Sequence, residues 1–205
     1  MAISRRRFLV GSTALSVAVA VGACDGDEEE AAQRPRTSGQ ETSPNQREPT
    51  PACDDGDEPS PEQTEGPFYT PDTPRRRNLV EDGVEGSPLV LTGAVLDTRC
   101  RPVAGALLDF WQADGNGEYD NSGFRLRGHQ FADSRGHFRL ATVVPGAYSG
   151  RTRHIHVKLQ PRGGEVLTTQ LYFPDEPANA ADGIFDERLV MAVSGRRARF
   201  DFILA

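Results

Sequence analysis

Residues 154–160 have the sequence HIHVKLQ, in which polar and apolar side chains alternate at every position. Because successive side chains of a β-strand point to opposite faces, His154 and His156 share one face of the predicted strand. Ile155 and Val157 then point into the opposite layer. The stretch therefore predicts a strand that buries an apolar face and presents two imidazole rings on the other side.

Similar short stretches recur along the chain from residue 89 onward. Alternating or apolar runs predict strands at residues 89–96, 103–112, 137–143, 154–160, 166–173, 188–193 and 198–204. Residues 98–102 and the sequence ADGNG at 113–117 predict turns. A short helical turn is expected within residues 176–187, and no long helical period is present. The pattern predicts an all-β domain, an antiparallel β-sandwich with long loops.

The N-terminal residues read as a targeting segment. SRRRFL at residues 4–9 resembles the twin-arginine export motif, and an apolar run continues to Ala23. We therefore predict a signal peptide at 1–23 and export by the twin-arginine route to the cell envelope. Residues 21–24 resemble a lipobox, which would make Cys24 a lipidated membrane anchor; the open alternative is simple cleavage nearby.

The net charge of −7 is unevenly distributed. Residues 25–63 carry twelve acidic and three basic side chains and almost no large apolar ones. Such a composition cannot bury enough apolar surface to fold, so residues 24–63 are predicted to be a disordered linker. The remaining domain, residues 64–205, is nearly neutral, which argues against a nucleic-acid partner.

Two cysteines lie outside the targeting segment, Cys53 and Cys100. In an oxidising compartment an even pair indicates a disulfide, so we predict a bond between them. Two unrelated thiols are the alternative.

Two tyrosines accompany the paired histidines. Tyr119 follows the glycine-rich turn, and Tyr148 lies in the loop that leads into the histidine strand. Phenolate oxygen and imidazole nitrogen suit a hard, highly charged cation such as Fe(III). Taken alone, the histidine pair could equally be two surface residues or half of a zinc site. His129 and His137 are expected to be structural or surface residues.

Residues 64–173 resemble the catalytic core of the intradiol ring-cleavage dioxygenases. The similar positions are GPFY at 66–69, LTGAV at 91–95, PVAGA at 102–106, Trp111, Tyr119, RG at 127–128, Asp133, Gly136, residues 142–145, Tyr148, Arg151, residues 154–156 and TTQ at 168–170. This resemblance implies a non-haem Fe(III) site with Tyr119, Tyr148, His154 and His156 as ligands. It also implies catalytic roles for Arg151, Gln170 and Tyr148.

The activity implied by the resemblance is cleavage of small catechols between their two hydroxylated carbons. Dioxygen would be the co-substrate, and cis,cis-muconate-type acids would be the products. A non-catalytic envelope sandwich that binds aromatics or sugars is the main alternative. A zinc hydrolase is a weaker one, because it leaves both tyrosines unexplained. The membrane is expected as a partner only through a lipid anchor on Cys24.

Overall fold

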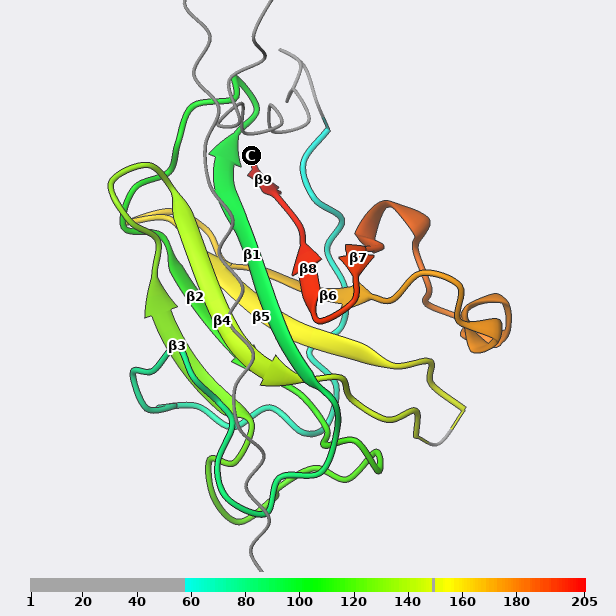
Figure 1. Cartoon of the computed structure of the whole chain (residues 1–205). Helices are drawn as coiled ribbons and strands as arrows, with labels where there is room; N and C mark the ends of the chain where they lie inside the picture. The colour runs from blue at the N-terminus through cyan, green and yellow to red at the C-terminus, as the bar shows by residue number, and fades with distance from the viewer. Residues whose placement is uncertain (1–57, 149) are drawn as a thin grey trace, which may run out of the picture. The chain divides into compact units, whose positions relative to one another are not determined.

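The computed structural model describes residues 58–148 and 150–205, which form two β-sheets (Figure 1). The first sheet has the order β4 (His137–Val143), β1 (Pro88–Asp97), β8 (Arg197–Arg199) and β7 (Ala192–Ser194), and β9 (Phe202–Leu204) also pairs with β1. The second has the order β3 (Arg127–Phe131), β2 (Leu107–Trp111), β5 (His154–Gln160) and β6 (Leu167–Tyr172). Two 3-10 helices, η1 (Pro177–Ala181) and η2 (Glu187–Leu189), lie between β6 and β7.

The two sheets share one apolar core, which confirms the predicted sandwich. Leu91 and Leu140 of the first sheet belong to the same buried cluster as Phe110 and Ile155 of the second. Across the layers, the rings of Phe110 and Phe138 have centroids 5.8 Å apart. Each large apolar side chain buried in this way stabilises the fold by roughly 1.5–3 kcal/mol relative to an exposed one. Ile155 therefore faces the core, as the alternation of its strand predicts.

Register in the second sheet decides which residues lie beside the two histidines. All three pairings of this sheet are antiparallel, and β5 lies between β2 and β6. His156 is opposite Trp111 on one side and Gln170 on the other. His154 is opposite Tyr172. Neighbours in register lie about 5 Å apart, so β2 and β6 supply the walls of a site built on β5.

The first sheet is mixed rather than wholly antiparallel. β1 pairs antiparallel with β4 but parallel with β8 and β9. The strand predicted at 198–204 is wrong as a single element, because the chain breaks between β8 and β9. Between these two strands the Asp201 carboxylate accepts the backbone N–H of Ala94 at 2.7 Å. The side chain thus takes the place of a backbone carbonyl from a neighbouring strand.

Two other predicted strands differ from the structure, and one strand was not expected. The strand expected at 188–193 is present only at its end, as β7. Its first residues belong to η2, where the Asp186 side chain accepts from the Arg188 N–H and caps the helical turn. The strand expected from residue 103 begins only at Leu107, after a turn at Gly105, which has φ 70°. Strand β3 was not predicted. The short helical turn expected within 176–187 is confirmed by η1.

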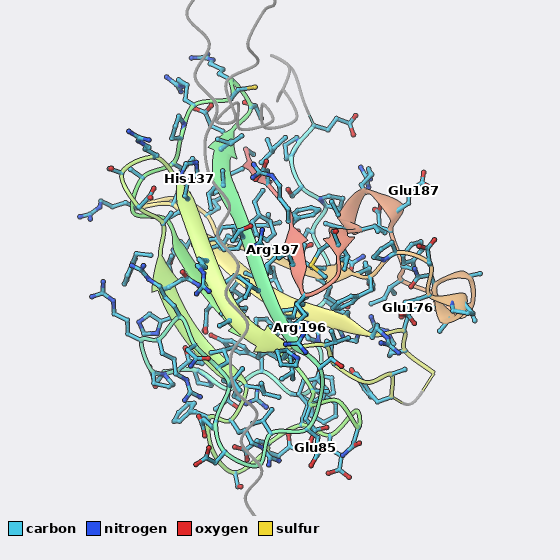
Figure 2. The ribbon with its side chains drawn as sticks, viewed as in Figure 1. Glu85, His137, Glu176, Glu187, Arg196 and Arg197 are labelled. Atoms are coloured by element: carbon cyan, nitrogen blue, oxygen red, sulfur yellow. The ribbon has the colours of Figure 1, made fainter. Side chains whose placement is uncertain are left out.

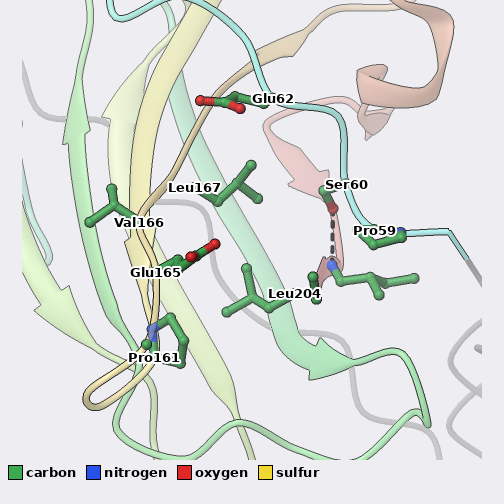
Figure 3. Close-up of a pocket in the computed structure, with 11 residues that line it drawn as sticks. Pro59, Ser60, Glu62, Pro161, Glu165, Val166, Leu167 and Leu204 are labelled. Carbon is green, nitrogen blue, oxygen red and sulfur yellow. Dashed lines mark hydrogen bonds between the residues drawn. The ribbon is translucent and has the colours of Figure 1, made fainter.

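The last residues of the predicted linker lie against the second sheet and β9. The Gln63 N–H donates to Thr168 O at 2.8 Å, and Thr169 Oγ1 donates to Pro61 O at 2.7 Å. The Ile203 N–H donates to Ser60 Oγ at 2.9 Å (Figure 3). Together with the β5–β6 turn, this segment encloses a cavity of about 580 Å³ whose walls include Val166, Leu167 and Leu204 (Figure 3).

Several predictions lie outside the described residues. These are the signal peptide at 1–23, the lipidation of Cys24 and the greater part of the linker. Cys100 is disulfide-bonded, while Cys53 lies outside the described residues, so its pairing stays a prediction. In residues 58–148 and 150–205, no helix is long and apolar enough to cross a membrane.

Candidate metal centre

The two histidines of β5 are buried and face each other. His154 and His156 are 2% and 1% exposed, and their Nε2 atoms lie 3.1 Å apart. His154 Nδ1 lies 2.6 Å from the carbonyl oxygen of Thr152, which makes Nδ1 the donor and leaves Nε2 with its lone pair free. The Trp111 ring stacks on His156 at 4.7 Å and 8°, and so fixes its plane. Both imidazoles thus aim Nε2 at the same point.

Both tyrosines predicted as ligands lie next to this pair. The ring centroid of Tyr119 is 6.4 Å from that of His156, and the centroid of Tyr148 is 5.7 Å from that of His154. The two tyrosine rings are 5.3 Å apart and nearly perpendicular. Residues from three separate parts of the chain therefore form one continuous cluster of four rings.

The loops that carry the tyrosines are packed backbone to backbone. Gly117 has φ 84°, and a Cβ at this position would lie 2.5 Å from the carbonyl oxygen of Ala147. The Asp114 side chain accepts the N–H of Glu118 at 3.0 Å, and its carbonyl accepts the N–H of Gly146 at 2.7 Å. Asp114 therefore ties the Tyr119 loop to the Tyr148 loop, which explains the glycines on either side of the contact.

Arg151 and Gln170, both predicted site residues, are in direct contact. The Arg151 Nη2 donates to Gln170 Oε1 at 2.6 Å, and Gln170 Nε2 donates to the carbonyl of Thr64 at 2.9 Å. The turn from Tyr148 to Arg151 is closed by a backbone bond of 2.7 Å between these two residues. All six predicted site residues consequently belong to one region at the end of β5 and β6.

Burial sets the protonation of the free site. It lowers the pKa of His154 to about 4, only partly offset by the Thr152 carbonyl. It also lowers the pKa of His156, helped by the adjacent His154. Burial and the neighbouring Tyr148 raise the pKa of Tyr119 above its ordinary value. The histidines are thus neutral, the form that binds metal, whereas a phenolate at Tyr119 needs a cation beside it.

Three buried polar atoms at this point lack a hydrogen-bond partner among the described residues: the Tyr119 hydroxyl, His156 Nδ1 and Trp111 Nε1. A buried hydroxyl without a partner is costly, so a ligand for it is expected. Two phenol oxygens and two imidazole nitrogens are a donor set that fits a hard trivalent cation.

The donor set also bears on the zinc alternative. In residues 58–148 and 150–205, no group of three or more histidine, cysteine, aspartate or glutamate side chains could hold a metal ion. A zinc site usually takes all of its protein ligands from these types. The two histidines therefore depend on the tyrosines to complete a metal site.

Three further residues near the site are not among the six predicted site residues. Phe68 stacks on Tyr119 with ring centroids 4.4 Å apart. Arg127, fully buried, donates to the carbonyl of Phe68 at 2.6 Å and to that of Asp120 at 2.7 Å. Asp182 pairs with Arg151 at 2.9 Å. Arg127 and Phe68 belong to the stretches that carry the resemblance, so only Asp182 lacked a sequence signal.

The other two histidines lie outside the cluster, as predicted. His137 is exposed at the start of β4 (Figure 2). His129 lies on β3, where its Nδ1 is 2.7 Å from the carbonyl oxygen of Thr73. Neither belongs to the ring cluster of Tyr119, Tyr148, His154 and His156.

Comparison with known proteins shows the family to which the chain belongs. A family model described as dioxygenase matches residues 64–200, most of the domain. The chain belongs to the intradiol ring-cleavage dioxygenase family. The family resemblance implied by the sequence is thereby confirmed, and so is the all-β fold class.

Two solved structures of the family share the fold. The dioxygenase domain of a dioxygenase–carbohydrate-binding protein fusion from Streptomyces sp. SirexAA-E is 52% identical, with a TM-score of 0.69. The match covers 72% of this chain and 98% of that domain. Hydroxyquinol 1,2-dioxygenase from Pseudomonas putida DLL-E4 is 26% identical, with a TM-score of 0.65, over 71% of this chain and 66% of that one.

Sequence relatives in the family are longer proteins. The protocatechuate 3,4-dioxygenase beta chain of Burkholderia cepacia is 35% identical over 128 residues, covering 53% of this chain and 54% of the relative. Catechol 1,2-dioxygenase of Pseudomonas sp. strain EST1001 is 26% identical over 67% of this chain and 55% of the relative. The chain thus spans about half the length of these relatives.

Proposed function

We propose that the chain is a non-haem Fe(III) dioxygenase that cleaves catechols between their hydroxylated carbons with O₂. The products would be cis,cis-muconate-type acids. The observation that carries the proposal is the convergence of four rings, with the His154 and His156 Nε2 atoms 3.1 Å apart. Family membership and the names of relatives such as catechol and hydroxyquinol 1,2-dioxygenase support it.

Tyr119, Tyr148, His154 and His156 would hold the ion. A bound ferric ion would favour the phenolate form of both tyrosines and provide coordination positions for the two oxygens of a catechol. Two phenolates offset most of the charge of a trivalent cation, and the neutral histidines add none. Stacking on Trp111 fixes the orientation of the His156 ring. The Thr152 carbonyl accepts the Nδ1 proton of His154, which leaves the Nε2 lone pair available to the metal.

Tyr148 is positioned to accept a proton from the substrate. It is half-buried and lies on the turn that ends at Arg151, whereas the Tyr119 hydroxyl is buried beneath Phe68 and the Tyr148 ring. We assign the proton of an incoming catechol hydroxyl to the Tyr148 oxygen. Phe68 gives the ring of a small catechol an apolar surface beside both tyrosines.

Arg151 is the cation placed to stabilise negative charge on the substrate ring. Its Nε donates to Asp182 and its Nη2 donates to Gln170. We assign the N–H groups of Nη1 to the substrate, because these two bonds fix the plane of the guanidinium that carries them. Gln170 has both ends of its amide engaged, so it acts by holding the guanidinium.

Oxygen uptake with product identification tests the function. The iron-loaded protein is given catechol, hydroxyquinol and protocatechuate, and products are identified by mass and NMR. We expect one O₂ consumed per catechol and a ring-opened diacid with both oxygens incorporated. A sandwich that only binds aromatics would bind catechol and consume no O₂. A product opened beside the diol, rather than between its carbons, would also contradict the proposal.

We also propose export through the twin-arginine route and lipidation of Cys24 in the mature chain. Support comes from the SRRRFL motif at 4–9 and the lipobox-like residues 21–24. Mass spectrometry of the membrane-fraction protein should show a diacylglycerol-modified Cys24 at the N-terminus. An unmodified terminus at another position would instead indicate plain cleavage.

A further inference from the structure

The loop between β6 and β7 carries the 3-10 helices η1 and η2. In Figure 2, the labelled Glu176 lies just before η1 and the labelled Glu187 is the first residue of η2. Asp182 follows η1 directly, and its N–H donates to the carbonyls of Ala178 and Asn179 at 3.1 and 3.3 Å. The Asp182 side chain is 0% exposed. A carboxylate buried this completely requires partners that satisfy both oxygens.

The Asp182 carboxylate accepts the backbone N–H of Ile184 at 3.2 Å, and its other partners are two successive residues that precede His154. Both carboxylate oxygens accept from Arg151 Nε, at 3.1 and 2.9 Å. One of them also accepts the backbone N–H of Thr152 at 3.0 Å. The Thr152 hydroxyl donates to Asn179 Oδ1 at 2.8 Å. The end of η1 thus holds both Arg151 and Thr152 by their polar atoms.

These contacts reach the candidate metal centre by two short routes. Through Arg151, the Nη2 atom is fixed against Gln170 Oε1 at 2.6 Å. Through Thr152, the carbonyl oxygen is fixed 2.6 Å from His154 Nδ1. The Nε–H is shared by both carboxylate oxygens and Nη2 is held by the Gln170 amide, so rotation of the guanidinium is restricted. Because the group is planar, the direction of the Nη1 N–H groups is restricted with it.

We propose that Asp182 is a positioning residue that aims Arg151 Nη1 at the negative charge developing on a bound catechol. This inference rests on the proposed function. Donors stabilise a transition state best when their orientation is fixed before the reaction, because no free energy is then spent on reorganisation. Burial alone would lower the pKa of Arg151, but the hydrogen bond and charge of Asp182 raise it, so the guanidinium stays charged.

The alternative is that the pair merely stabilises the loop, and kinetics separate the two. Asp182→Asn keeps the shape of the side chain but weakens its hold on Arg151. We expect kcat and kcat/KM for catechol to fall together, by about 10- to 100-fold. Iron content and the affinity for catechol measured without O₂ should stay within about threefold of wild type, because ligands and ground-state contacts remain.

A double-mutant cycle shows whether Asp182 acts through Arg151. In an Arg151→Ala background, Asp182→Asn should lower kcat by less than about twofold, because the group that it positions is absent. Asp186→Asn is the matched control. Asp186 lies in the same loop and accepts from Arg188 Nε at 3.0 Å, but this pair is at the surface, so kcat should not change.

Several results would overturn the inference. One is that Asp182→Asn lowers kcat as much in the Arg151→Ala background as in the wild type. The others are that Asp182→Asn raises only KM, or that its loss of activity is matched by an equal loss of iron. If Asp182→Asn does not fold, Thr152→Val removes only the hydroxyl bond to Asn179 and should lower kcat about threefold at unchanged iron content. Unchanged kcat in Thr152→Val would then count against the inference. An inactive wild type would overturn the proposed function as well.

Discussion

The Nε2 atoms of His154 and His156 lie 3.1 Å apart in a site from which water is largely excluded. His154 Nδ1 donates to the Thr152 carbonyl, so His154 Nε2 is an acceptor. Two such nitrogens can share one proton or one cation. Because burial lowers the pKa of both rings, an extra proton is disfavoured and a shared metal ion is the better partner.

Replacement of His154 tests its role in metal retention. His154→Ala removes one of two imidazole nitrogens, and we expect the iron content of the purified protein to fall by about tenfold or more. His137→Ala is the control, since His137 is exposed at the start of β4. Metal analysis that finds equal iron in both variants would show that His154 is not a ligand.

Arg127 is expected to be a structural support of the Tyr119 side of the site. Its guanidinium donates to the carbonyls of Phe68 and Asp120. Arg127→Met leaves both carbonyls without these donors, which should lower the free energy of unfolding by about 2–4 kcal/mol. Urea denaturation of Arg127→Met and of Arg139→Met, an exposed arginine of β4, measures the difference. Equal stability of the two variants would contradict this role.

The stability contribution of Asp182 should depend on pH in a defined direction. Burial, the largest single influence, raises the pKa of Asp182. The hydrogen bonds from Arg151 and from the backbone N–H groups of Ile184 and Thr152, together with the charge of Arg151, outweigh burial, and the pKa is lowered. The unfolded chain therefore binds a proton at Asp182 more readily than the folded chain does. The difference in unfolding free energy between wild type and Asp182→Asn should be constant above about pH 5 and shrink below about pH 4.

Urea titrations across this range, at fixed ionic strength, measure the Asp182 difference directly. A difference that grows on acidification would mean that the carboxyl is more easily protonated in the folded chain. That result would contradict the ion pair with Arg151.

Sequence patterns predicted the long strands from their regularly placed apolar side chains. Strand β4 alternates between exposed and buried side chains over residues 137–140, and β5 alternates in polarity although both of its faces are buried near His154. Strands β1, β4, β5 and β6 lie close to the expected positions. Strand β3 reads RGHQF and lies at the edge of its sheet, so its sequence lacks the alternation that burial imposes. The break between β8 and β9 depends on Asp201 bonding to Ala94, a contact 107 residues apart that no local pattern reveals.

The site was predictable in part for the same reason. His154 and His156 follow from the two-residue period of one strand, whereas Tyr119 and Tyr148 lie on loops and were assigned through the family resemblance. Asp182 had no signal, because its function depends on Arg151, which is 31 residues away in sequence. From sequence alone, a single aspartate in a loop is expected to lie at the surface. Its burial becomes evident only when the structure shows its partner.

The visible absorption spectrum of the iron-loaded protein tests the shared metal site most directly. Wild type should bind one iron per chain and be red-brown, since phenolate-to-Fe(III) charge transfer absorbs visible light. Tyr119→Phe should lose most of this band and of the iron, while Tyr69→Phe, whose hydroxyl bonds to Asp109, should keep both. A colourless iron-loaded wild type, or a Tyr119→Phe variant with an unchanged band, would contradict the assignment of the four ligands.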